Sequence, residues 1–122
     1  MPLSQKSLKV EGKVTGLSQF YSDGTERLEI WISKKYKEVL PAKDNQRVPI
    51  KLVFGDQVYD AGLRMTPRCS VIWICPNLEM GGSKVRLADL VESSGFRKND
   101  TLEIFVSEDN FVIPSPTLKN EG

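Results

Sequence analysis

The sequence predicts a mainly β (α+β) fold, specifically a seven-stranded open or pseudo β-barrel with two short helices. Apolar and polar residues alternate in three segments, 28–33, 48–54 and 101–106, as in strands with one buried face. Only two segments have the spacing of a helix, and both are short. Because an open sheet would leave edges that promote aggregation, a closed or nearly closed barrel is the favoured arrangement.

Both helices are predicted from where their apolar pattern stops. The first covers 34–40 and ends at Pro41, which cannot continue a helix. The second lies within 84–95, where Gly95 occupies the position of a left-handed cap and Phe96 can fold back over the last turn.

The remaining strands differ in character. Pro49 has no N–H to donate, so the strand over 48–54 is expected at a sheet edge there. The segments 58–63 and 71–75 are more uniformly apolar, which predicts strands covered on both faces. The composition of 77–83 predicts a loop.

The bulk composition is that of an ordinary globular protein, with 39% hydrophobic and 27% charged residues. A chain of 122 residues fits one domain, 1–122, with polar tails at about 1–9 and 114–122. No apolar run approaches the roughly 18 residues needed to span a bilayer, and the first residues lack the apolar block of a signal peptide. The expected location is therefore the cytoplasm, with no membrane partner.

Most catalytic chemistry is excluded by residue type. There is no histidine, which removes the commonest general base and the usual zinc sites. Cys69 and Cys75 lie in extended chain about 20 Å apart, too far for a disulfide. The run 81–84 lacks the upstream glycine of a phosphate loop and predicts a turn, as does Asn99 before Asp100. No lysine follows Glu103 at the spacing usual in metal nucleases, and Asp100 is explained by the turn, so we expect no enzyme activity, metal or cofactor. The carboxylates considered for a nuclease site are Asp56, Asp60, Asp100 and Glu103.

The net charge of +1 hides an uneven distribution. Between 34 and 51, six basic residues stand against two carboxylates, giving +4, whereas 84–122 has five against seven, giving −2. Such a run is often only a solvated face, but it also permits an anion-binding face.

Two stretches have a recognisable order of elements. KVTGLSQFYSDGTERLEIWISKKYKEVLP (13–41) reads as strand, polar loop, strand and a short helix of lysine and aromatic residues ending at proline. VRLADLVESSGFRKNDTLEIFV (85–106) reads as a helix, then a basic residue and Asn99-Asp100 before a strand. This order resembles the DNA-binding pseudobarrel family, which includes the plant "B-three" transcription-factor domains and the effector domains of some bacterial restriction endonucleases. The plant pattern before the second helix is missing, so the resemblance is nearer to the bacterial domains.

The resemblance implies that two loops act as arms, which hold a DNA duplex and reach base edges in its major groove. The first arm matches 17–27, and the second matches 64–70, which is shorter than many second arms of the family. The residues implied in DNA contact are Ser18, Gln19, Tyr21, Ser22, Asp23, Thr25 and Arg27 in the first arm, Arg64, Thr66, Arg68 and Ser70 in the second, and Lys34, Lys35 and Lys37 as phosphate partners.

These residue types suit DNA recognition. Gln19 can read adenine, Asp23 can accept from a cytosine amino group, and Arg27 can address guanine. In the second arm Pro67 limits how much the loop must stiffen on binding. The chain is expected to be the target-recognition or effector domain of a restriction–modification enzyme, with double-stranded DNA as its partner and a nuclease domain either fused or separate.

Other interpretations stay open for each residue. The run 22–25 also fits a plain turn, Arg27 can pair with Glu26 or Glu29, and the tryptophans Trp31 and Trp73 fit a core. The competing functions are a protein-interaction or small-ligand barrel and, less favoured because few aromatic residues lie among the basic ones, a single-strand binder.

Overall fold

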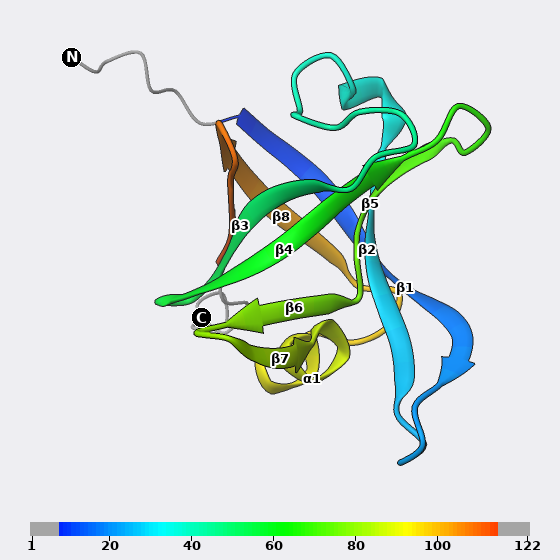
Figure 1. The fold of residues 1–122 in the computed structure, drawn as a ribbon, viewed down its shortest axis with the longest axis vertical. Coiled ribbons are helices and arrows are strands. Elements are labelled where there is room, and N and C mark those ends of the chain that lie inside the picture. The colour runs from blue at the N-terminus through cyan, green and yellow to red at the C-terminus, as the bar shows by residue number, and fades with distance from the viewer. Residues whose placement is uncertain (1–7, 115–122) are drawn as a thin grey trace, which may run out of the picture.

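Residues 8–114 are the part of the chain that the computed structural model describes, and most of them lie in strands (Figure 1). The strands are β1 (Leu8–Phe20), β2 (Glu26–Ser33), β3 (Val48–Phe54), β4 (Gln57–Met65), β5 (Val71–Ile74), β6 (Asn77–Met80), β7 (Ser83–Arg86), β8 (Thr101–Ser107) and β9 (Asn110–Ile113). The helices are the 3-10 helix η1 (Lys34–Tyr36) and the α-helix α1 (Leu87–Ser93). None of the described helices is long and apolar enough to cross a membrane.

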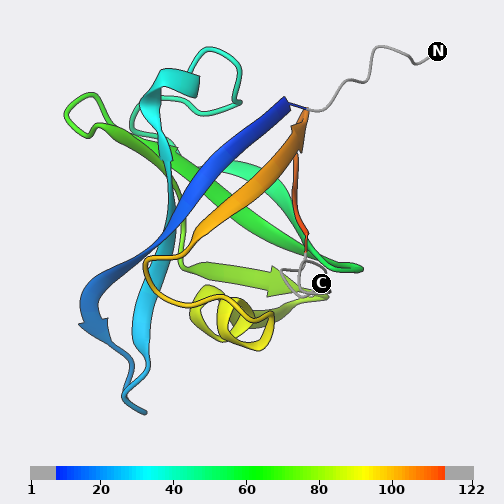
Figure 2. The ribbon, with the colours of Figure 1, turned by 180° about the vertical axis from the view of Figure 1, so that it is seen from behind.

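Seven strands close into a barrel in the order β3-β9-β8-β1-β2-β5-β4, and pairing of β3 with β4 completes the ring. The β3–β9 pair is parallel, and the other pairs of described strands are antiparallel. The β6–β7 hairpin is attached to β4, and together with α1 it lies at one end of the barrel (Figures 1 and 2). The predicted seven-stranded, mainly β barrel is confirmed.

Apolar side chains fill the barrel interior. Every second residue of the barrel strands points inward, and among residues 8–114 no polar or charged side chain is buried. Gly12 marks a tight point on β1, since a Cβ atom there would lie 2.7 Å from a methyl carbon of Ile30 and 2.8 Å from one of Ile104. A barrel of this strand number has room for its own side chains. Binding sites are therefore to be sought on the outer surface.

The prediction of a loop over 77–83 is wrong, because this segment forms β6 and the start of β7. Gly81 and Gly82 have φ values of +60° and +87°, as a two-residue hairpin turn with left-handed residues requires. The adjacent pair Gly81-Gly82 was the feature of the sequence that could have predicted this hairpin turn. The predicted start of the second helix at residue 84 is wrong for the same reason, since β7 continues to Arg86.

The helix ends follow local chemistry. Gly95 has φ +93°, and the Phe96 N–H donates to the carbonyl of Val91 at 3.0 Å, which confirms the predicted cap. The predicted helix over 34–40 is reduced to η1 followed by turns, with the Ser33 hydroxyl accepting from the Lys35 N–H at 3.2 Å. A segment this short is below the length at which an α-helix is stable by itself.

The expectation that 58–63 and 71–75 are covered on both faces is wrong for most of their length. Val58 is 52% exposed, Asp60 is exposed and burial alternates along β5, whereas residues 61–63 are buried in succession. The placement of both tryptophans in the core is also wrong, since Trp31 is 37% exposed and Trp73 is half-buried on the outer face. Isoleucines from the same two strands take the inward positions, so register leaves the tryptophans outside.

Several local predictions are confirmed. Pairing of β3 with β9 begins at Lys51, so among the described strands Pro49 faces only β4. Cys69 and Cys75 are free thiols. The Arg97 N–H donates to the Asp100 carboxylate at 2.8 Å, as expected of a turn.

The predicted polar tails lie largely outside the described residues. The tail over 1–9 overlaps β1, which begins at Leu8, and residues 1–7 are not described. Of the tail over 114–122, only Pro114 is described.

Candidate functional site

Two hairpins project from the side of the barrel formed by β2 and β5 (Figures 1 and 2). The first arm (17–27) is mostly strand, because β1 continues to Phe20 and β2 begins at Glu26. The second arm (64–70) is the connection from β4 to β5. Along β2, Ser33 lies six residue steps after Arg27, and it pairs with Val71 at the base of the second arm. At about 3.4 Å per residue the two arms stand roughly 20 Å apart.

The turn of the first arm is held by Asp23. One carboxylate oxygen accepts from the Thr25 N–H at 3.0 Å, and the other accepts from the Arg86 guanidinium of β7 at 2.8 Å. These contacts lower the pKa of Asp23 to about 2, and the hydrogen bond from the Thr25 backbone has the largest effect. The side chain that the resemblance offers as a cytosine reader is thus already engaged within the protein.

Tyr21 lies between the arm and β7 and contacts two arginines. The guanidinium carbon of Arg86 is 4.0 Å from the Tyr21 ring centroid, and that of Arg27 is 5.5 Å from it. The Tyr21 hydroxyl and the Arg27 Nε are covered and have no hydrogen-bond partner within residues 8–114.

Arg27 does not make the alternative ion pairs considered from the sequence. The Glu26 carboxylate instead accepts from Lys98 at 3.0 Å and from the Ser18 N–H at 3.0 Å, which lowers its pKa. The described residues contain no salt bridge from Arg27 to Glu29. The side chains of Ser18 and Gln19, within the register shift between Gly16 and Phe20, are exposed, as is that of Ser22 in the turn.

Lys34 holds the second arm in place. Its ammonium group donates to the carbonyls of Thr66 at 2.6 Å and Cys69 at 3.0 Å. The Thr66 hydroxyl accepts from the Cys69 N–H at 3.3 Å, so Thr66 is also used within the loop. Arg68 and Ser70 are exposed, as are Lys35 and Lys37 beside the arm.

Replacing Lys34 with methionine, which keeps the apolar stem, is expected to loosen this arm. Loss of two hydrogen bonds from a charged donor should lower the free energy of unfolding by about 1–2 kcal/mol. Trypsin should also cleave faster after Arg68. Lys37→Met is the matched control, since that lysine is exposed. Equal unfolding free energies and equal cleavage rates for the two variants would show that Lys34 does not fix the arm.

Two tryptophans cover the surface between the arms. Trp73 pairs with Trp31 on one side and with Arg64 on the other. The Trp31 indole N–H donates to the Glu29 carboxylate at 2.9 Å, and burial raises the pKa of Glu29 against the effect of that bond. Arg68 and Ser70 border the same depression. The alternation of the strand could have predicted that Trp31 faces outward, because Trp31 occupies a polar-side position of 28–33.

Five of the six arginines gather on this side of the barrel: Arg27, Arg47, Arg64, Arg68 and Arg86. We refer to this surface as the arginine face. The Arg47 guanidinium lies across Gly62, where a Cβ atom would overlap it. Arg97, the sixth, borders a separate depression with α1.

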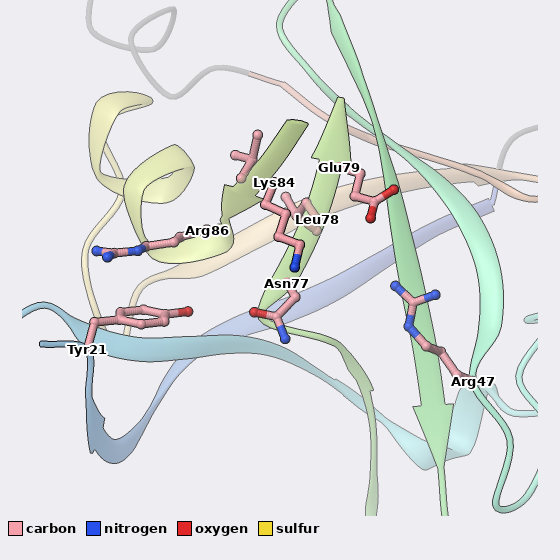
Figure 3. A pocket seen from close by; sticks show the side chains of 8 residues that line it. Tyr21, Arg47, Asn77, Leu78, Glu79, Lys84 and Arg86 are labelled. Carbon is pink, nitrogen blue, oxygen red and sulfur yellow. The ribbon is translucent and has the colours of Figure 1, made fainter. Parts of the chain in front are cut away.

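The sequence-based site omits Arg47, Lys84 and Arg86, which line an open groove of about 520 Å³ with Tyr21 (Figure 3). Arg86 reaches the first arm through its ion pair with Asp23, and Lys84 lies on the same hairpin, which has a single registered residue pair with β4. Arg47 comes from the segment before β3 and packs on Gly62 of β4. No group of three or more potential metal-ligating side chains occurs in the described part of the chain.

Comparison with protein-family models, with curated proteins and with solved structures found no match to this chain. The arrangement itself is therefore the basis for inferring function.

Proposed function

We propose that this chain binds double-stranded DNA sequence-specifically, with its two arms in the major groove, as the target-recognition or effector domain of a restriction–modification enzyme. The observation that carries the proposal is the arginine face. A guanidinium presents a planar fork of donors that fits both a guanine edge and a phosphate, so arginines on two projecting hairpins and on the surface beside them suit a duplex. Membership of the pseudobarrel family is part of the same proposal, supported by the order of elements and the two arms.

The spacing of the arms also suits a duplex. Roughly 20 Å along β2 corresponds to about six base-pair steps at 3.4 Å each. The exposed side chains of Gln19 and Ser22 and the half-buried Arg27 in the first arm, and the exposed Arg68 and Ser70 in the second, are assigned to base edges and nearby phosphates. Asp23, Thr66 and Lys34 already form hydrogen bonds within the protein, so they are assigned to fixing the conformation of the arms.

A second candidate is a protein-interaction surface centred on Trp31 and Trp73. Their partly exposed rings form an apolar patch, and aromatic residues are enriched at protein interfaces. The surrounding arginines fit that function as well, because arginine is also common at interfaces.

Selection from a randomised duplex pool distinguishes the two. The protein is expected to enrich a defined sequence at fixed salt, and Arg97→Ala, which lies off the arginine face, should enrich the same sequence. Absence of duplex binding even at low salt would contradict the DNA proposal and leave the protein-interaction surface.

The lysines beside the second arm are expected to act through charge alone. Replacing Lys35 or Lys37 with alanine should weaken binding to all duplexes by similar factors and reduce the salt slope by about one unit each. Lys34 should contribute less, because carbonyls already engage its ammonium group. The measurement is the logarithm of affinity against the logarithm of salt concentration for three single variants. An unchanged slope in Lys35→Ala and Lys37→Ala would place these lysines away from DNA.

A further inference from the structure

The groove between the first arm and the β6–β7 hairpin has the chemistry of an anion site. Tyr21 enters from the arm, Arg47 from the segment before β3, and Asn77, Lys84 and Arg86 from the hairpin (Figure 3). Every one of these side chains can donate a hydrogen bond. Donors from three parts of the chain therefore line the groove, although the Arg86 guanidinium is turned toward Tyr21 and Asp23 and away from Arg47 and Lys84.

The charges of the groove leave two cations available. Asp23 forms an ion pair with Arg86. Glu79 also lines the groove and lies opposite Lys84 in the register of the hairpin. Within residues 8–114 no ion pair joins Arg47 or Lys84 to a carboxylate. The three basic groups against these two carboxylates leave a net charge of +1.

The first arm, which contributes Tyr21 to the groove, also has two polar atoms without partners within residues 8–114. The Tyr21 hydroxyl and the Arg27 Nε are covered and make no hydrogen bond among the described residues. The basic and hydrogen-bond-donating side chains that line the groove suit an anion with acceptor oxygens.

We propose that this groove binds a phosphodiester group of a DNA strand, next to the base-reading arms. The inference rests on the proposed function, since it assigns to the duplex a backbone contact beyond the two arms. A phosphodiester has a single charge and only acceptor oxygens, which matches the net charge and the donors of the groove. Because the groove adjoins the first arm through Tyr21, a strand held by that arm can continue into it.

The first test uses the double variant Arg47→Ala/Lys84→Ala. Its salt slope on the selected duplex should fall by about two units, with an unchanged bound-sequence profile. The control is Arg97→Ala/Lys13→Ala, which removes one arginine and one lysine outside the groove. This variant should lower the salt slope by less than the groove variant does. If the groove variant and the control have equal slopes while the duplex is bound, the groove inference is wrong and the DNA-binding proposal stands.

The second test needs no variant and uses the Nε–H signals of the six arginines in a nitrogen-labelled protein. A single-stranded tetrathymidylate should shift the signals of Arg27, Arg47 and Arg86 and leave Arg97 in place. Such shifts in a protein that binds no duplex would overturn the proposed function and keep the groove as a strand site. Equal shifts with inorganic phosphate at the same concentration would mean a free-anion site, and no shifts with either would mean no site. Both of these outcomes overturn the groove inference.

Discussion

Alanine in place of Arg27 or Arg68 is expected to weaken binding to the preferred duplex by about 1–3 kcal/mol, or roughly 5- to 150-fold, while barely affecting a scrambled duplex. The reason is that a guanidinium can bind two acceptors of one guanine edge at once. Arg68 is exposed on the second arm, and the Arg27 Nε has no partner within residues 8–114. Specificity should therefore fall together with affinity.

The measurement is the bound-sequence profile of each variant, selected at one salt concentration. Arg27→Lys and Arg68→Lys should restore only part of the loss, because an ammonium group cannot reproduce the planar fork. Arg97→Ala is the matched control, since it removes the same charge from the one arginine off the arginine face. If wild type, Arg27→Ala and Arg68→Ala give the same profile, the arms do not read bases.

Phe111→Ala is expected to lower the free energy of unfolding by about 3–5 kcal/mol. Phe111 is fully buried on β9, where it pairs with Leu52 of β3 and Val106 of β8. Removing the ring leaves a cavity at the strand that joins β8 to β3 and so completes the barrel. This loss is a large part of the 5–15 kcal/mol typical of a domain.

Phe105→Ala is the control, because Phe105 is only half-buried on the neighbouring strand β8. Its cost should be clearly smaller, and chemical denaturation of both variants measures the difference. Equal losses at the two positions would mean that β9 does not pack into the barrel as described.

The local pattern of the chain was sufficient to predict the barrel. Alternation over 28–33, 48–54 and 101–106 specifies which side chains can face a core, and the inward residues of β2, β3 and β8 are those that the pattern selects. The cap at Gly95 and the turn at Asn99 were predictable for the same reason, since both depend on neighbouring residues only. The loop assigned to 77–83 failed because its apolar signal is short, although Gly81 and Gly82 marked a hairpin.

The candidate site depends on contacts between residues far apart in the sequence. Arg86 of β7 contacts Asp23 of the first arm, 63 positions earlier, and Arg47 from the segment before β3 lines the same groove, which no local pattern specifies. Likewise, hydrogen bonds across tens of residues set the roles of Lys34 and Asp23, which sequence alone presents as free charges. Residue type and spacing therefore determine which groups can bind DNA, whereas strand register and long-range hydrogen bonds determine which of them remain available to do so.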